Sequence, residues 1–267
     1  MGSTSDDPPM TSTTNTTNTT NGDATTSFPN GTNSSEEQSR KDEEDIPYWN
    51  VNVPPHLRTQ TCPSYLLNLN PKDLSIISTP DSHYEIESWP TVLSKIRSYR
   101  PDLFQRIPSD LRRYHEFCYN IKQQYGSVMN FILSQRLGWE HPIIPKGDEP
   151  FECEEDVKIL RNDWPYGIDG KIVHLVVWVK FELEAEGEKG DLTEKETKVV
   201  GEWVRKKFVV EGGLEEGRVV WFRNWTCLKS VKSVEHFHVM LFDPDKELVD
   251  GLTGGDVPLC ERVKLSI

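Results

Sequence analysis

Apolar residues between positions 70 and 140 recur at spacings of three and four, which is the period of one helix face. The segment 107–126 shows this most clearly, and Gly126 provides a stop signal at its end. A shorter apolar helix is expected directly after it, ending near Gly138. The less polar face of the first segment consists of Leu111, Tyr114, His115, Cys118, Ile121 and Tyr125.

Two prolines mark earlier helix starts. Asn70 precedes Pro71, and Ser88 or Trp89 precedes Pro90. Proline suits the first turn of a helix because the amide hydrogen that it lacks would have no partner there. Both sites are therefore predicted to be capped helix N-termini.

The pattern changes after the proline-rich stretch 141–150. β-Branched and aromatic residues dominate four segments, which are predicted to be strands. Between the second and third of them, Asp191 or Thr193 is followed by Glu194 and Glu196, which is a capping signature for a helix. The predicted order is strand, strand, helix, strand and strand, over residues 156–170, 171–184, 191–210, 218–225 and 232–242. This order predicts an α+β fold with an antiparallel sheet and a packed helix.

These patterns divide the chain into three parts. Residues 1–45 are rich in Thr, Asn, Ser and acidic residues and have almost no large apolar side chains, so this tail is predicted to be disordered. Residues 46–150 are predicted to form a mainly helical segment that packs on the core. Residues 151–267 are predicted to form the α+β domain.

Charge and cysteine content narrow the class of protein. The net charge is −13, and the first 45 residues hold nine acidic residues against two basic ones. A general nucleic-acid platform needs a concentrated basic patch, so the composition disfavours one. The five cysteines form no CxxC pair, which indicates free thiols in a reducing compartment. We find no signal peptide and no apolar run of about 20 residues, so we expect no contact with a membrane. The expected location is the cytoplasm, and the nucleus is a second possible location.

One strand carries the candidate chemistry. In the predicted strand near the C-terminus, His236 and His238 alternate with Phe237 and Val239. Side chains two apart share a face of a strand, so the two imidazoles lie about 7 Å apart on one side. At neutral pH an imidazole can act as a nucleophile, a proton shuttle or a metal ligand.

Hydrogen-bond donors precede this strand. Asn224, Ser230 and Ser233 lie on the connection that leads into it, together with Thr226 and Lys229. Such donors suit phosphate oxygens. The pattern therefore favours a phosphate site, while two core histidines bonded to backbone carbonyls are the structural alternative.

The residues from Asn224 to Phe242 resemble the signature of histidine-triad proteins. In that family an Asn and a Ser/Gly-containing connection lead into three histidines that alternate with apolar residues. His236 and His238 match the first two positions, whereas Met240 stands where the third histidine belongs. The earlier segment containing Asn162, Trp164 and Pro165 is similar to the turn that enters the family's second strand.

This resemblance implies a mechanism. His238 would attack the α-phosphorus of a nucleotide and His236 would orient the site. The phosphate or nucleotide would be bound by Asn224, Ser230, Ser233, Asn162 and Trp164. No cofactor is implied, and the expected partner is a nucleotide or a sugar nucleotide. Met240 leaves open whether the site is catalytic.

A second resemblance spans nearly all of the chain beyond the tail. The segments "STPDSHYEIESWPTV", "DLFQRIPSDLRRYHEF", "LRNDWPYGID" and "SVEHFHVMLFDPD" are similar to the fungal N-acetylglucosamine-induced protein 1 family. The resemblance implies a fungal protein tied by name to an amino-sugar response. It implies no particular reaction.

Two alternatives to an enzyme stay open. The protein could be a sensor that binds a nucleotide or sugar nucleotide without turnover, or a regulatory interaction protein. A metal site could combine His236 and His238 with His174 or Cys227, but no second close-spaced ligand pair exists, so no metal is predicted. The sequence leaves the oligomeric state open.

Overall fold

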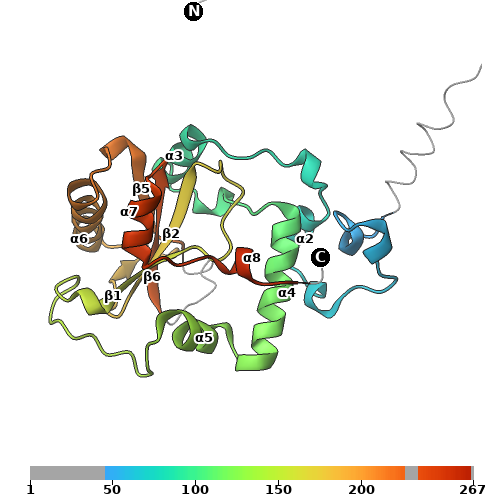
Figure 1. Ribbon diagram of the computed structural model, residues 1–267, viewed down its shortest axis with the longest axis horizontal. Coiled ribbons are helices and arrows are strands. Elements are labelled where there is room, and N and C mark those ends of the chain that lie inside the picture. The colour runs from blue at the N-terminus through green and yellow to red at the C-terminus, as the bar shows by residue number, and fades with distance from the viewer. Residues whose placement is uncertain (1–45, 226–233, 266–267) are drawn as a thin grey trace, which may run out of the picture. The chain divides into compact units, whose positions relative to one another are not determined.

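Four antiparallel strands form the central sheet (Figure 1). The computed structural model describes residues 46–225 and 234–265. In spatial order the strands are β1 (Val157–Arg161), β2 (Ile172–Val179), β6 (Glu235–Phe242) and β5 (Val219–Phe222). The two long strands, β2 and β6, occupy the centre and are almost wholly buried, and most of their residues are apolar on both faces.

The register between β2 and β6 determines the face on which each histidine lies. Val176 is opposite His238, and Trp178 is opposite His236. Directly opposite residues in an antiparallel pair point to the same face. The predicted histidine pair therefore shares one face with these two β2 side chains, and we call it the histidine face.

The opposite face packs on two helices. Helix α6 spans Glu194–Val204 and continues as a π-helical turn over Arg205–Glu211, and α7 spans Lys246–Thr253. The Thr193 side chain accepts a hydrogen bond from the Glu196 amide, so the predicted cap of α6 is confirmed. The core on this side includes Leu175, Val177, Val200, Phe208, Phe237 and Val249.

The histidine face is covered by helices that precede the sheet in the chain. They are α3 (Trp89–Arg97), α4 (Pro108–Tyr125) and α5 (Val128–Phe131), the last continuing as a π-helical turn over Ile132–Leu137, and α2 (Pro71–Ile77) packs on α4. The side chains of Asn70 and Ser88 cap α2 and α3, and Gly126 with a positive φ ends α4. These predicted boundaries are confirmed.

The remaining elements are short. A two-stranded ladder joins β3 (Ala185–Glu186) to β4 (Asp191–Leu192), and α8 spans Leu259–Arg262. Single 3₁₀ turns cover Tyr48–Asn50, Pro55–Leu57, Ser64–Leu66, Asp81–His83, Pro101–Leu103, Glu154–Asp156 and Glu216–Arg218.

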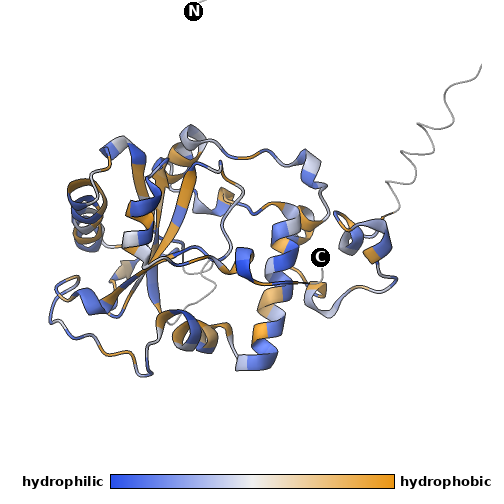
Figure 2. Cartoon of the chain, in the orientation of Figure 1, coloured by the Kyte–Doolittle hydropathy of each residue, from blue (hydrophilic) through white to orange (hydrophobic). Residues whose placement is uncertain are grey.

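The α+β class is confirmed. The order strand, strand, helix, strand and strand is observed from β1 to β6, and the central strands carry much of the hydrophobic colour in Figure 2. Residues Ile46–Ile267 cluster as one compact unit. No helix among the described residues is both long and apolar enough to cross a bilayer. The predicted tail, 1–45, lies outside the described residues, and the division at residue 150 stays a prediction.

Candidate functional site

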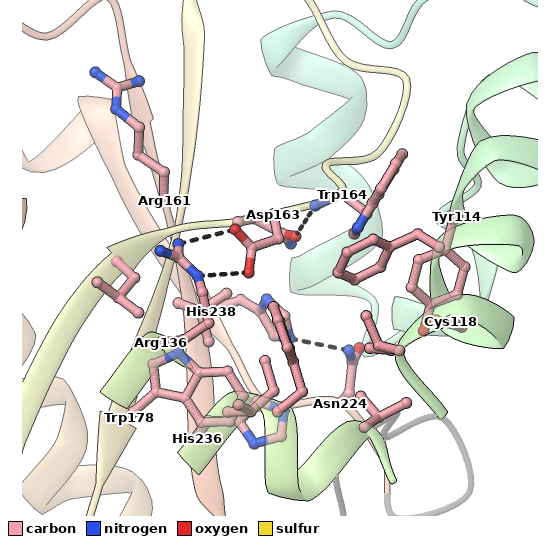
Figure 3. A pocket seen from close by; sticks show the side chains of 18 of the residues that line it. Tyr114, Cys118, Arg136, Arg161, Asp163, Trp164, Trp178, Asn224, His236 and His238 are labelled. Atoms are coloured by element: carbon pink, nitrogen blue, oxygen red, sulfur yellow. Dashed lines mark hydrogen bonds and ion pairs between the residues drawn. The ribbon is translucent and has the colours of Figure 1, made fainter. Parts of the chain in front are cut away.

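A cavity of about 140 Å³ lies over the histidine face (Figure 3). Its floor includes His236 and His238 from β6, and Val176 and Trp178 from β2. Helix α4 and the segment 128–137 contribute the opposite wall. Side chains from distant parts of the chain therefore enclose a single hollow around the predicted histidines.

Both ring nitrogens of His238 are hydrogen-bonded. The Asn224 Nδ2–His238 Nε2 distance is 3.0 Å, and the His174 Nε2–His238 Nδ1 distance is 2.9 Å. With the Asn224 amide in this orientation, Nδ2 donates and His238 Nε2 accepts. The His238 proton then lies on Nδ1 and is donated to His174 Nε2. The site thus fixes one tautomer of His238, and the Asn224 amide caps the Nε2 lone pair.

His174 supplies a third imidazole from the neighbouring strand. It lies directly opposite Met240, the position where the third histidine of the triad pattern is missing. Burial lowers the pKa of His174 to about 3, and the positive charge of Arg106 acts in the same direction. His174 is therefore neutral at physiological pH and can accept the His238 proton in a hydrogen bond.

Asn162 holds His174 in place. Its Nδ2 lies 3.1 Å from His174 Nε2 and 3.2 Å from Nδ1, while its Oδ1 accepts a hydrogen bond from the Trp164 amide. The backbone bond from Asn162 N to the His174 carbonyl adds a second link. Asn162 therefore acts on the site through His174.

His236 is oriented by its own strand. Its Nδ1 lies 2.8 Å from the Val234 carbonyl oxygen and donates to it, so the neutral ring keeps Nε2 as its acceptor nitrogen. The ring stacks on Trp178 with a centroid distance of 4.6 Å, and it meets His238 edge-on at 5.8 Å. The two predicted histidines are thus adjacent but not parallel.

Arg106 places a positive charge at the border of the cavity. Its guanidinium lies over the Tyr114 ring at 4.2 Å, and its Nε donates to the Trp164 carbonyl at 2.9 Å. The same guanidinium lies 5.7 Å from the centre of the Tyr166 ring. Within the described part of the chain, no carboxylate lies at ion-pair distance from Arg106. Its charge is therefore available to an anionic ligand.

Arg136 also borders the cavity, but carboxylates neutralise its charge. It forms ion pairs of 2.8 Å with Asp163 and 2.7 Å with Asp256, and all three side chains are largely buried. Burial raises the pKa of the Asp163 carboxyl, and Arg136 opposes this effect. This group stabilises the cavity wall and offers no free charge.

Five of the seven predicted site residues border the cavity: His236, His238, Asn224, Asn162 and Trp164. The other two, Ser230 and Ser233, lie outside the described residues, as does Cys227 of the metal alternative.

Trp164 belongs to the wall of the cavity. Its side chain is buried and packs on Phe117 with a centroid distance of 5.4 Å, so it lies among core residues. Its predicted contact with a base stays a prediction.

The described residues contain no group of three or more His, Cys, Asp or Glu side chains that could hold a metal ion. His174 and His238 are hydrogen-bonded to each other instead. This arrangement differs from the metal alternative, in which the same imidazoles would converge on an ion.

Sequence reasoning placed His174 beside the histidine pair only in the metal alternative, and it gave Arg106 no role. The alternation in "IVHLVVWV" places His174 on one face of its strand, but only the register with β6 brings it to His238. Arg106 precedes α4 in a loop, and no local pattern relates it to residues more than 100 positions later.

Comparison with known proteins defines the family. The chain belongs to the family described as "Protein of unknown function (DUF3605)", whose model matches residues 88–242. The match spans the helices over the histidine face and all four strands of the central sheet.

The particular relatives are fungal. N-acetylglucosamine-induced protein 1 of Candida albicans is 28% identical over 186 residues, which are 63% of this chain and 73% of that protein. An uncharacterized protein of Saccharomyces cerevisiae is 28% identical over 159 residues, covering 58% of this chain and 79% of the relative. The predicted kinship with the N-acetylglucosamine-induced protein is confirmed.

A solved structure supports the fold. The crystal structure of HTC1 superposes with a TM-score of 0.53 and 24% identity, covering 64% of this chain and 98% of that one. The likeness concerns the fold alone.

Proposed function

We propose that the cavity binds the phosphate group of a small phosphorylated molecule, with nucleotides and sugar nucleotides as the first candidates. The observation that carries the proposal is the cluster of His236, His238 and Asn224 around one cavity bordered by the guanidinium of Arg106, which forms no ion pair among the described residues. Imidazole, amide and guanidinium groups are common phosphate partners in proteins.

The size of the cavity limits what enters it. Its volume of about 140 Å³ equals that of about five water molecules at ~30 Å³ each. Pockets that enclose a drug-sized ligand measure about 300–1,000 Å³. A phosphate group with a small attached group fits, whereas most of a nucleotide would extend beyond the cavity.

If the site transfers the phosphoryl group, His238 Nε2 is the nucleophile. Its lone pair forms the bond to phosphorus, and the phosphorus–oxygen bond to the leaving group breaks with its electron pair on the leaving oxygen. The Nδ1 proton stays on His238, because the low pKa of His174 disfavours proton transfer to it. A water oxygen then forms a bond to phosphorus, the phosphorus–nitrogen bond breaks with its electron pair returning to Nε2, and the proton lost by the water passes to solvent. The product is the hydrolysed phosphate, which is a nucleoside monophosphate where the α-phosphorus of a nucleotide was attacked.

Two features bear on this step. The Asn224 amide caps Nε2, so a phosphate must displace it before attack and can then accept its hydrogen bond. Met240 replaces a third histidine, so no imidazole at that position protonates the leaving group. The leaving phosphate of an anhydride departs as an anion and needs no proton, which favours nucleotides and sugar nucleotides as transfer substrates.

The Candida relative is named for induction by N-acetylglucosamine. We propose that the present chain also takes part in the response to this amino sugar. UDP-N-acetylglucosamine is then a candidate ligand. A cytoplasmic or nuclear location agrees with such a role and stays a prediction.

Calorimetric titration tests the proposal. The purified chain is titrated with inorganic phosphate, AMP and UDP-N-acetylglucosamine, together with His238→Asn and with His115→Asn as the matched control. His115 lies on α4 and pairs with Asp73, apart from the cavity. We expect saturable binding by the wild type and the control, and loss of at least about tenfold in affinity for His238→Asn. Binding that His238→Asn leaves unchanged would contradict the proposal.

A sensor without turnover is the second candidate, and the capped lone pair of His238 favours it. Mass spectrometry separates the two functions. Products, or an adduct on His238, after incubation with the nucleotides support transfer. Saturable binding with unchanged ligand supports a sensor.

A further inference from the structure

From the geometry of the cavity we infer that its ligand carries a compact apolar group, an aryl or branched alkyl group, next to the phosphate. This inference rests on the proposed function, because it assumes that the histidine end of the cavity binds the phosphate. It adds that the other end of the cavity selects a phosphate ester whose organic part is apolar, and it therefore ranks such an ester above the nucleotides and sugar nucleotides that the proposed function names first.

The polarity of the floor changes along one row of residues across the sheet. Leu160 on β1 pairs with Val176 on β2, and Val176 pairs with His238 on β6. Neighbouring strands lie about 4.8 Å apart, so this row runs from an aliphatic to an imidazole side chain over roughly 10 Å. In the next row Lys158 on β1 pairs with Trp178 on β2, and Trp178 pairs with His236 on β6, so only the part from Trp178 to His236 repeats the change.

The opposite wall is apolar over the aliphatic end of these rows. Phe117 and Ile121 of α4, with Phe131 and Ile132 of the following helix, belong to the same buried cluster as Leu160 and Val176. All six side chains border the cavity. Asn224, His236 and His238 mark the opposite, polar end.

Three charged groups border the cavity beside these side chains. Arg136 and Asp163 bond to each other, Arg136 also bonds to Asp256, and the Arg161 guanidinium lies 3.8 Å from the Asp250 carboxylate. Hydroxyl groups of a sugar placed against aliphatic carbon lose hydrogen bonds to water without replacement, which is unfavourable. An apolar group in the same place loses no hydrogen bonds to water, and its binding is favourable because apolar surface is removed from water.

The volume limits the group to a small one. An apolar protein cavity of about 150 Å³ accepts benzene, and the present cavity, polar end included, measures about 140 Å³. It therefore encloses a phosphate with a few attached carbon atoms or most of one small ring, and part of a phenyl phosphate extends beyond it.

Titration with four probes tests the inference, with Trp164 and Trp178 as fluorescent reporters in the cavity wall. The probes are inorganic phosphate, phenyl phosphate, ribose 5-phosphate and AMP. Burial of one small ring predicts that phenyl phosphate binds about tenfold more tightly than ribose 5-phosphate or inorganic phosphate.

A pair of substitutions on β2 provides the matched control. Val176→Thr adds a hydroxyl group to the cavity floor at nearly constant shape, whereas Val177→Thr makes the same change on the opposite face of the strand. We expect Val176→Thr to weaken phenyl phosphate binding several-fold more than it weakens inorganic phosphate binding. Val177→Thr should preserve the ratio between the two probes.

The outcomes separate this inference from the proposed function. If inorganic phosphate and all three esters fail to bind, the proposed function fails and the inference with it. If inorganic phosphate binds but ribose 5-phosphate or AMP matches phenyl phosphate, the proposed function stands and the inference is overturned. An equal loss of phenyl phosphate affinity in Val176→Thr and Val177→Thr also overturns it.

Discussion

At the scale of residues, the site is a chain of three polar contacts centred on His238. Asn224 donates to one ring nitrogen, and the other ring nitrogen donates to His174, which Asn162 positions. The neutral His174 ring has one acceptor nitrogen, and with the His238 proton on Nδ1 this acceptor is His174 Nε2. The tautomer of His238 therefore depends on groups from three different strands and loops.

The buried neutral state of His174 predicts a pH effect on stability. In the unfolded chain a histidine binds a proton below a pH of about 6.5, whereas folded His174 does so only near its pKa of about 3. Acidification therefore favours the unfolded state. From pH 7 to pH 5 this group alone lowers the free energy of unfolding by about 2 kcal/mol.

Urea unfolding at the two pH values measures this effect. His174→Asn should lose about 2 kcal/mol less than the wild type between pH 7 and pH 5, whatever its stability at pH 7. His141→Asn, at an exposed loop position, serves as the control and should keep the wild-type pH dependence. Identical pH dependence in wild type and His174→Asn would contradict the buried neutral assignment.

The pair His236 and His238 was predictable from sequence because alternation along a strand is a local property. The third imidazole was not, because it depends on the register between strands 60 residues apart in the chain. Arg106 was not predictable for a similar reason, since a loop position becomes part of a site only through tertiary packing.

At the scale of elements, a seam between two loops positions Arg106 and Tyr166. The Gly167 amide donates to the Gln105 carbonyl at 2.9 Å, and the Tyr84 hydroxyl lies 3.1 Å from the carbonyl oxygens of both residues. Gly167 is buried, and a methyl group on its Cα would overlap the Tyr84 ring. Position 167 of the seam therefore requires glycine, because any side chain there would overlap the Tyr84 ring.

Gly167→Ala should lower the free energy of unfolding by about 1–3 kcal/mol through overpacking. It should also weaken phosphate binding, because Arg106 and Tyr166 flank the seam. Gly170→Ala is the control, since a methyl group there meets open space. Denaturant unfolding and calorimetry measure the two effects, and equal behaviour of both variants would refute the role of the seam.

Several element boundaries followed from local chemistry, including the caps at Asn70, Ser88 and Thr193 and the stop at Gly126. The placement of α4 over the histidine face did not. Its amphipathic pattern shows that one face is buried but does not identify the surface against which it packs.

At the scale of the whole molecule, a buried ion-pair group ties the C-terminal segment to the cavity wall. Arg136 bonds to Asp256, whose carboxylate also accepts the Arg161 amide, and to Asp163, whose carboxylate accepts the Leu259 amide. Segments more than 90 residues apart thus meet at one guanidinium. Its long-range partners explain why the sequence pattern did not single it out.

Asp256→Ala should lower the free energy of unfolding by about 3 kcal/mol, because it leaves a buried guanidinium with one of its two carboxylates. Asp250→Ala removes the ion pair with the exposed Lys246 and the 3.8 Å pair with the partly exposed Arg161, and should cost less than about 1 kcal/mol. Thermal or urea unfolding of the two variants checks the difference. A smaller cost for Asp256→Ala than for Asp250→Ala would show that the group does not tie the segment to the wall.

Nitrogen-15 NMR of the histidine side chains, titrated with inorganic phosphate, tests the central claim that the histidine pair binds phosphate. His236→Asn and His238→Asn assign the resonances, and exposed His141 is the internal control. We predict a His238 ring protonated at Nδ1 in the free protein, and a saturable change at Nε2 of His238 as phosphate replaces the Asn224 amide, with His141 unaffected. Unchanged His236 and His238 resonances at saturating phosphate would contradict the account.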